Sequence, residues 1–220
     1  MRPIPRAAVQ QCAVRGQYGR GTLHGKKVRV YRREDDVSPH SKTETFAALK
    51  LFVDNWRWQD VPFYLRTGKR LPRQFSEVAI RFRTVPHQSF PPESSRDWHP
   101  SRLVLSIQPE EGIVMGFQAK YPGPKMLLRP VEMRFTYQDS FAVPSPGAYE
   151  TLLWDVMDND LTLFMRADQV EASWQILMPV LDVWTESNPR SFPNYASGSW
   201  GPKAADELLT REGHAWRPMA

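Results

Sequence analysis

The chain has 220 residues, of which 41% are hydrophobic and 12% aromatic, and its formal net charge is +5. This composition is typical of a globular protein and excludes an intrinsically disordered chain. Because 24 acidic residues nearly balance 29 basic ones, most charges are expected to lie on a solvated surface. The sequence has no long uninterrupted apolar run, so we expect neither a transmembrane helix nor a signal-peptide core.

Cys12 is the only cysteine. An intrachain disulfide is therefore impossible, and a cytoplasmic, reducing location is expected. None of the five histidines has a partner histidine four positions away, so the clustered ligands that zinc prefers are missing and we expect no metal site. A Gly-x-Ser-x-Gly elbow is also absent, which leaves a serine hydrolase without motif support.

Strand signals dominate the first half of the chain. Residues 1–40 are basic and are expected to form an extended, loop-rich lead-in. Residues 43–58 are rich in Thr, Phe, Val and Trp and favour a long strand, although Ala47 to Lys50 would also fit a helix. A short strand is predicted over 61–66, followed by a turn at 67–69.

Residues 76–83 alternate in polarity, because Val78, Ile80 and Phe82 occupy one side and small or charged residues the other. This alternation predicts a half-buried strand. The Pro- and Ser-rich segment 86–100 is expected to be a surface loop. Three further strands are predicted over 102–108, 112–119 and 131–137, and a tight turn at 110–112 joins the first two.

The pattern then changes to helical spacing. Two helices are predicted from apolar residues three or four positions apart, one containing Tyr149, Leu152, Leu153 and Val156 and the other Val170, Trp174, Leu177 and Leu181. Near the end of the chain, Pro202 is placed to open a third helix that runs through Leu209. Because strands come first and helices later, the expected fold class is α+β with a mostly antiparallel sheet.

Neither glycine-rich segment meets the requirements of a phosphate-binding loop. Gly19 to Gly25 resembles Gly-x-Gly-x-x-Gly, but its last glycine comes one residue late and no strand and helix pattern flanks it. A flexible turn is expected there. Gly68-Lys69 lacks the upstream glycine and the following Ser or Thr of a Walker motif.

Basic residues gather near the start of the chain and between 66 and 83. Such clusters favour an anionic partner, which could be a metabolite phosphate, a nucleotide or nucleic acid. Arg81 and Arg83 flank Phe82, as in some nucleic-acid binding strands, but a sheet with one solvated face already explains this alternation. We therefore expect no nucleic-acid partner and no membrane partner.

Three runs of the sequence are highly specific. They are Thr43-Glu44-Thr45-Phe46-Ala47-Ala48-Leu49, Asp54-Asn55-Trp56-Arg57-Trp58 and Val61-Pro62-Phe63-Tyr64-Leu65-Arg66-Thr67-Gly68-Lys69-Arg70-Leu71. Shorter characteristic stretches recur along the chain, among them Arg15-Gly16-Gln17-Tyr18, Ile107-Gln108-Pro109 and the tail from Tyr195 through Trp200-Gly201-Pro202. Together these stretches resemble the carboxy-terminal domain of the glucose-6-phosphate dehydrogenase family.

The resemblance implies a single domain over residues 1–220. Its fold would be a large, mostly antiparallel sheet with helices packed on one face and a homodimer partner on the other. The implied activity is that of the family in the pentose phosphate pathway: oxidation of glucose 6-phosphate to 6-phosphogluconolactone, with hydride passing to NADP. In that chemistry a His–Asp pair removes the proton of the sugar's C1 hydroxyl.

The family places this base, its Asp-His-Tyr-Leu-Gly-Lys substrate motif and its Gly-x-x-Gly-Asp-Leu coenzyme fingerprint upstream of this region. None of these motifs occurs in the 220 residues. The resemblance therefore implies that the Rossmann coenzyme domain is absent here, and that these residues include neither the catalytic base nor a coenzyme-binding residue.

Substrate contacts carry over from the resemblance at two positions. Lys69 matches a lysine of the family's substrate site, and its ammonium suits an anionic or hydroxylated ligand. Gln108 matches a second contact, and its amide can both donate to and accept from sugar hydroxyls. Some members have another basic residue five positions after the lysine; this chain has Gln74 there, and the adjacent Arg73 is the candidate replacement.

Some family members also bind a second, structural NADP in this domain. Arg66 matches one of the basic residues that they use. However, Ser106 and Ala79 stand where other basic residues would be, and Arg134 stands where an acidic residue would be. The resemblance therefore implies no structural NADP in this chain.

Three hypotheses for the function remain open from the sequence. In the first, the chain is the carboxy-terminal part of a glucose-6-phosphate dehydrogenase, supplies substrate-pocket residues and the dimer interface, and is inactive alone. In the second, it is a stand-alone oligomerisation or regulatory module that pairs with an intact dehydrogenase. In the third, it is one half of a split enzyme whose coenzyme domain is another chain.

Overall fold

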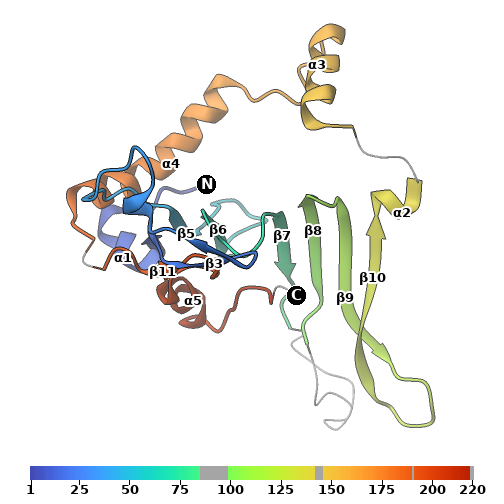
Figure 1. Ribbon diagram of the computed structural model, residues 1–220. Helices are drawn as coiled ribbons and strands as arrows, with labels where there is room; N and C mark the ends of the chain where they lie inside the picture. The colour runs from blue at the N-terminus through green and yellow to red at the C-terminus, as the bar shows by residue number, and fades with distance from the viewer. Residues whose placement is uncertain (85–98, 142–145, 190, 219–220) are drawn as a thin grey trace. The chain divides into compact units, whose positions relative to one another are not determined.

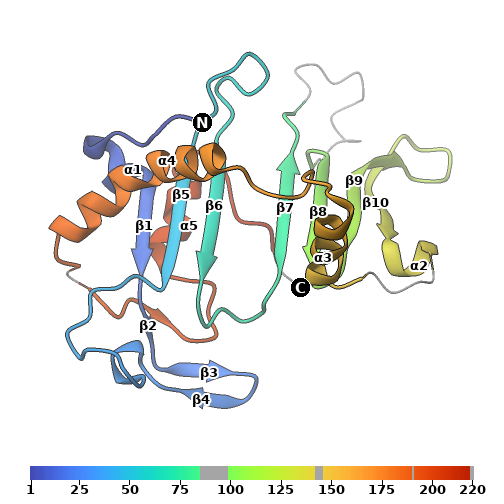
Figure 2. The same cartoon turned by 90° about the horizontal axis from the view of Figure 1, so that it is seen from above.

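The computed structural model describes residues 1–84, 99–141, 146–189 and 191–218. These residues form two compact units, one of Met1–Arg73 with Phe164–Ala220 and the other of Gln74–Leu163. We call them unit 1 and unit 2 (Figures 1 and 2). Each unit contains an antiparallel sheet and helices, which confirms the α+β class.

Unit 1 is built on a three-stranded antiparallel sheet. Its strands are β1 (Ala13–Gly16), β5 (Phe46–Leu51) and β6 (Phe63–Gly68), in the order β1-β5-β6. A strand is confirmed within the long one favoured over 43–58, but this central strand β5 covers only six residues, and residues 56–60 form a turn. The strand predicted at 61–66 is confirmed as β6.

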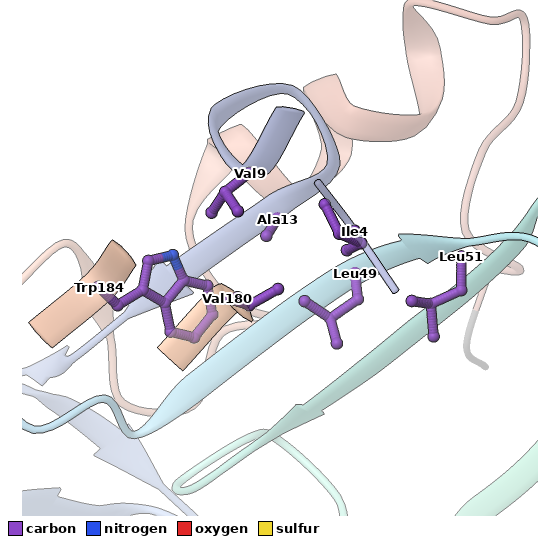
Figure 3. Close-up of a cluster of buried hydrophobic side chains, with 7 residues drawn as sticks. All are labelled: Ile4, Val9, Ala13, Leu49, Leu51, Val180 and Trp184. Carbon is purple, nitrogen blue, oxygen red and sulfur yellow. The ribbon is translucent and has the colours of Figure 1, made fainter. Parts of the chain in front are cut away.

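The residues of β5 alternate between two hydrophobic cores. Leu49 and Leu51 face a cluster that also contains Val180 and Trp184 of helix α4 (Ala167–Glu186) and Val9 of α1 (Val9–Cys12) (Figure 3). On the opposite face of the sheet, Phe46 and Ala48 pack against Ala205, Leu208 and Leu209 of α5 (Lys203–Thr210). Helices therefore cover both faces of this sheet, and a strand buried on both sides lacks clean polar alternation.

The amino-terminal segment holds more structure than the predicted loop-rich lead-in. Besides β1, it contains the hairpin β3 (Gly21–Leu23) and β4 (Lys26–Val28), and β2 (Tyr18–Gly19), which pairs in parallel with β11 (Tyr195–Ala196). His24 and Gly25 form the hairpin turn with positive φ values of 50° and 78°. The glycine-rich segment therefore belongs to a β-hairpin. Two short 3-10 helices complete the segment, η1 (Arg6–Ala8) and η2 (Tyr31–Arg33).

Unit 2 is built on a four-stranded antiparallel sheet. Its strands are β7 (Ser76–Arg81), β8 (Arg102–Gln108), β9 (Gly112–Lys120) and β10 (Leu128–Thr136), in the order β10-β9-β8-β7. All four predicted strands are confirmed, and the turn expected at 110–112 joins β8 to β9. The loop predicted at 86–100 falls almost entirely outside the described residues.

One face of this sheet is apolar and partly exposed. The register places Met115 opposite Leu103 and Met133, and Ile113 opposite Leu105 and Phe135, on the same face. Met133 is 64% exposed. Val78, on the same face of β7, is 45% exposed, so the half-buried strand expected there is more open than its alternation indicates. The opposite face carries Glu132, which pairs with Arg102 and Arg134.

The remaining helices of unit 2 are α2 (Tyr137–Phe141) and α3 (Ala148–Asp158). The predicted helices around Tyr149, Val170 and Pro202 are confirmed as α3, α4 and α5. Across the described residues, no helix combines the length and the apolar composition needed to cross a membrane.

Candidate functional site

Lys69 lies in the turn that follows β6. The strand ends at Gly68, one residue beyond the start of the predicted turn, and both Lys69 and Arg70 are exposed. Arg70 has a φ of 55°, a left-handed conformation that ends a strand sharply. Within the described ranges no carboxylate forms an ion pair with Lys69, so its ammonium is available to an anionic or hydroxylated ligand.

The backbone of this turn is held by hydrogen bonds from distant segments. The amide of Lys69 donates to the carbonyl oxygen of Thr45 (2.7 Å). The hydroxyl of Tyr195 donates to the carbonyl oxygen of Lys69 (2.9 Å), and the amide of Gly198 donates to that of Arg70 (2.8 Å). The lysine therefore stands on a turn that is fixed at three backbone groups, although its side chain is exposed.

Close packing underneath explains the glycine before Lys69. A Cβ atom on Gly68 would lie 2.8 Å from the ring of Phe46, which is 2% exposed. Only glycine allows the backbone to approach this ring so closely. The turn is thereby seated on the core shared by Phe46 and Tyr195, whose ring centroids are 5.5 Å apart.

Arg70 differs from Lys69 in that its charge is engaged within the protein. Its guanidinium lies 5.9 Å from the ring centroid of Tyr18 and 3.3 Å from a carboxylate oxygen of Glu34. A hydrogen bond with Tyr18 is the main reason why the pKa of Arg70 is raised. Lys69 is consequently the cation of this turn that is directed to solvent.

Arg73 and Gln108, the other two predicted substrate residues, lie in different units. Arg73 is exposed four residues beyond Lys69, at the end of the first segment of unit 1. Gln108 ends β8 in unit 2, where its Nε2 donates to Oγ of Ser76 (3.0 Å). Lys69 and Arg73 therefore lie in the same unit, and Gln108 lies in the other. The substrate role of all three residues stays a prediction.

Sequence reasoning missed Thr45 and Tyr195 as residues of this site. Both occur in the stretches that carry the family resemblance, but nothing in the spacing connects them, because 150 positions separate them. Only the pairing of β11 with β2 and of β5 with β6 brings them beneath the turn that carries Lys69.

The described residues do not fit a dinucleotide coenzyme of the Rossmann type. Such a site needs a parallel strand, a glycine turn and a helix amino-terminus. Here the two main sheets are antiparallel, and Gly19 to Gly25 belongs to β2 and the β3–β4 hairpin. Arg66, which matches a basic residue of the family's structural NADP site, lies between the rings of Trp200 and Trp216, at 5.2 and 4.4 Å from their centroids.

Metal ligands are not grouped in the part of the chain that the structure describes. No three His, Cys, Asp or Glu side chains come together there in a way that could hold an ion.

Comparison with known proteins connects nearly the whole chain to one family. Residues 1–217 match the family described as "Glucose-6-phosphate dehydrogenase, C-terminal domain". The chain is 45% identical over 208 residues to the glucose-6-phosphate 1-dehydrogenase of Chlamydia pneumoniae, covering 94% of this chain and 41% of that protein. It is 44% identical over 218 residues to that of Mycolicibacterium smegmatis, with coverage of 98% and 43%.

Solved structures give the same result. A structure described as "Glucose-6-phosphate dehydrogenase in complex with its substrate glucose-6-phosphate" is 32% identical and superposes with a TM-score of 0.82, covering 98% of this chain and 43% of that one. The glucose-6-phosphate 1-dehydrogenase of Mycobacterium avium gives a TM-score of 0.72 at the same identity. The chain spans less than half the length of each of these relatives.

Proposed function

Because this chain belongs to the glucose-6-phosphate dehydrogenase family, whose C-terminal domain it matches over residues 1–217, we propose that it serves as that part of such an enzyme. Its role is to contribute substrate-binding side chains and an oligomer interface. The complete enzyme would oxidise glucose 6-phosphate to 6-phosphogluconolactone, and bound NADP would accept the hydride. The proposed setting is the cytoplasm, which suits the free thiol of Cys12.

The observation that carries this proposal is the geometry of the Lys69 turn. An ammonium on a flexible stem binds phosphate or hydroxyl oxygens through charge-assisted hydrogen bonds. Such contacts orient a substrate best when the backbone that supplies them is rigid. Here the amide and the carbonyl of Lys69 are both bonded to buried residues of unit 1, while the side chain is exposed.

Arg73 and Gln108 have secondary roles in the proposal. Arg73 would add a second positive charge on the segment of Lys69, where a planar guanidinium suits the phosphate group. The amide of Gln108 would contact sugar hydroxyls, which its donor and acceptor atoms can both satisfy. Its present bond to Ser76 would then orient the amide.

The base and the coenzyme site would come from outside the 220 residues. The motifs for both are missing from the sequence, and the described residues do not fit a Rossmann-type dinucleotide site. We therefore propose a division of labour in which this chain binds and orients the sugar phosphate, while another domain removes the C1 hydroxyl proton and holds NADP.

A homodimer through the four-stranded sheet is the second part of the proposal. Several apolar side chains of one face are exposed, and apolar patches of a few hundred Å² are seldom left bare. The exposed members of this face are Val78, Ile113, Met115, Val131 and Met133.

The test of the substrate role is Lys69→Ala in these 220 residues joined to a coenzyme-binding domain of the family. Loss of a charge-assisted hydrogen bond is worth about 1.5–3 kcal/mol, so kcat/KM for glucose 6-phosphate should fall about 10- to 150-fold. The dissociation constant for NADP should stay unchanged. Lys69→Arg should restore only part of the activity: it keeps the positive charge, but its guanidinium is bulkier than an ammonium and planar.

Lys27→Ala is the matched control, because Lys27 is an exposed lysine of β4 in the same unit. It should leave kcat/KM as it is. The unjoined 220-residue chain should not reduce NADP, since loss of a general base alone costs about 10²- to 10⁴-fold and the coenzyme site is missing too. Unchanged kinetics of Lys69→Ala, or robust turnover by the pure 220-residue chain, would contradict the proposal.

A further inference from the structure

The hydroxyl of Tyr195 lies directly beneath the backbone of the Lys69 turn. Its oxygen is 2.9 Å from the carbonyl oxygen of Lys69, 3.0 Å from Oγ1 of Thr45 and 3.1 Å from the carbonyl oxygen of Thr45. Tyr195 reaches this position from β11, which is 126 positions away from Lys69 in the chain.

A count of protons shows which of these contacts Tyr195 makes as a donor. Oγ1 of Thr45 accepts from the amide of Tyr18 (3.0 Å), and its own proton is therefore free to go to the oxygen of Tyr195. The carbonyl of Thr45 already accepts from the amide of Lys69 (2.7 Å). The single proton of Tyr195 is thus best used on the carbonyl of Lys69, which gives every polar group a partner.

The anchor is rigid because it is buried and packed. Tyr195 is 6% exposed, and its ring contacts those of Phe46 and Tyr18 at centroid distances of 5.5 and 6.4 Å. Burial raises the pKa of Tyr195 to about 12, so the hydroxyl keeps its proton at neutral pH. A buried hydroxyl without a hydrogen-bond partner carries a large free-energy cost, because the surroundings have a low dielectric constant.

The same segment also holds the next residue of the turn. The amide of Gly198 donates to the carbonyl of Arg70 (2.8 Å), and Oγ of Ser197 donates to the carbonyl of Gly19 (2.9 Å). The segment from Tyr195 to Gly198 therefore donates hydrogen bonds to two consecutive carbonyl groups of the turn, those of Lys69 and Arg70. This segment therefore holds the backbone from which the Lys69 side chain extends.

We propose that Tyr195 is a positioning residue for sugar-phosphate binding, and that its hydroxyl acts by holding the backbone carbonyl of Lys69. The inference rests on the proposed role of Lys69 and adds to it a buried residue that does not touch the substrate. A misplacement of about 1 Å can cost a large part of the rate, so a loosened turn should weaken substrate binding although Lys69 is still present.

The test is Tyr195→Phe, in the chain joined to a coenzyme-binding domain as above. This variant keeps the ring and removes only the hydroxyl. Because one neutral hydrogen bond is lost, the KM for glucose 6-phosphate should rise about 3- to 10-fold. The dissociation constant for NADP should stay unchanged. Tyr64→Phe is the control: it removes a tyrosine hydroxyl of β6, the strand that precedes Lys69, whose partner is Glu212, and should leave this KM unchanged.

A double-mutant cycle separates positioning from general destabilisation. If Tyr195 acts through Lys69, Tyr195→Phe should raise KM in the presence of Lys69 and have no further effect in the Lys69→Ala background. Hydrogen exchange at the amide of Lys69 should also be faster in Tyr195→Phe, since this amide belongs to the same anchor.

Each outcome is decisive. A Lys69→Ala effect without a Tyr195→Phe effect on KM overturns the inference and leaves the proposed function standing. Equal effects of Tyr195→Phe with and without Lys69 also overturn it, because they indicate a structural role alone. No effect of Lys69→Ala overturns the proposed function and the inference together.

Discussion

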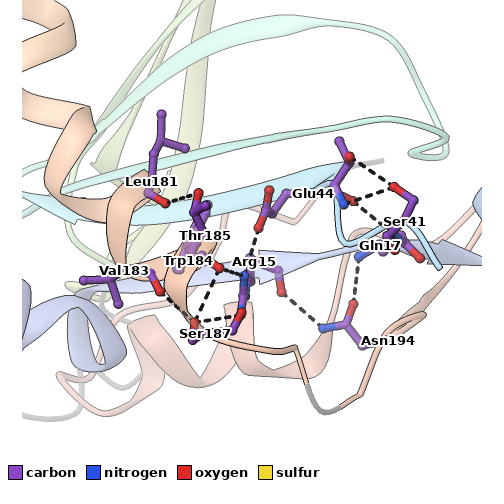
Figure 4. Close-up of polar contacts among 11 residues, drawn as sticks. Arg15, Gln17, Ser41, Glu44, Leu181, Val183, Trp184, Thr185, Ser187 and Asn194 are labelled. Atoms are coloured by element: carbon purple, nitrogen blue, oxygen red, sulfur yellow. Dashed lines mark hydrogen bonds and ion pairs between the residues drawn. The ribbon is translucent and has the colours of Figure 1, made fainter. Parts of the chain in front are cut away.

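The guanidinium of Arg15 lies at the carboxyl end of α4, with Nη1 2.6 Å from the carbonyl oxygen of Trp184 (Figure 4). Nη2 donates to the carbonyl and to the hydroxyl of Ser187, both at 3.0 Å, and Nη1 also pairs with Glu44 at 3.0 Å. The last carbonyls of a helix lack partners within the helix and attract a cation. Arg15 therefore joins α4 to the edge strand β1 of unit 1.

Replacing Arg15 should destabilise unit 1. Because the side chain is only 13% exposed, Arg15→Leu leaves Glu44 and the carbonyl of Trp184 without their donor, and the free energy of unfolding should fall by about 2–3 kcal/mol. Arg6→Leu is the control, since Arg6 pairs with Glu186 and Asp182 of the same helix but is half exposed. Urea unfolding should show little change for Arg6→Leu, and equal losses for the two variants would contradict this reading.

Gly201 is required by both its conformation and its neighbour. Its φ is 111°, and a Cβ atom there would lie 2.3 Å from the ring of Phe46. Gly201→Ala should lose about 1–2 kcal/mol from the backbone and about 1–3 kcal/mol more from overpacking. Gly213→Ala, with a φ of 72° and no atom within 4 Å of the new Cβ, should lose only the backbone part. Thermal unfolding of the two variants measures the difference, and a larger loss for Gly213→Ala would refute the role of Phe46.

Glu212 should make the stability depend on acid pH. A hydrogen bond from Lys50 is the main reason why the pKa of Glu212 lies below its ordinary value of 4.5. Since the folded-state pKa is the lower one, the stabilisation is fully present above about pH 4.5 and is lost as the pH falls through the folded-state pKa. Glu212→Gln should therefore lose less stability than the unchanged protein between neutral and acid pH.

The measurement is urea unfolding of both proteins at about pH 7 and about pH 3.5. Tyr64→Phe is the companion variant, because Tyr64 donates a second hydrogen bond to Glu212 (2.8 Å) while the contact with Lys50 is kept. It should retain most of the pH dependence. If Glu212→Gln and the unchanged protein lose the same stability on acidification, the assigned cause is wrong.

The proposed dimer can be tested at both faces of the four-stranded sheet. Light scattering should give twice the monomer mass. Met133→Glu places a charge on the apolar face, while Arg134→Glu reverses a charge on the opposite face and sets it beside Glu132. Met133→Glu should dissociate the dimer, because an uncompensated charge at an interface is strongly unfavourable. Arg134→Glu should leave the dimer intact. A monomer at high concentration, or a dimer that neither variant weakens, would count against the sheet as the interface.

Local patterns were enough to predict most of the elements. The alternation of Val78, Ile80 and Phe82 predicts a strand whatever its surroundings, because successive residues of a strand point to opposite sides. The spacing of Val170, Trp174 and Leu177 likewise predicts α4. The long runs around Thr45 and Lys69 carry the family resemblance, and the family comparison confirms it.

The surroundings of Lys69 become apparent only when the chain is folded. The strands, the helices, the family and the lysine could be predicted from the sequence, since these depend on neighbouring residues in the chain. The sequence did not indicate that α5 covers the second face of β5, that the lead-in supplies β1, or that Tyr195 holds the turn of Lys69. These features depend on contacts between segments that lie from thirty to more than a hundred positions apart, and such contacts leave no periodic trace in the sequence.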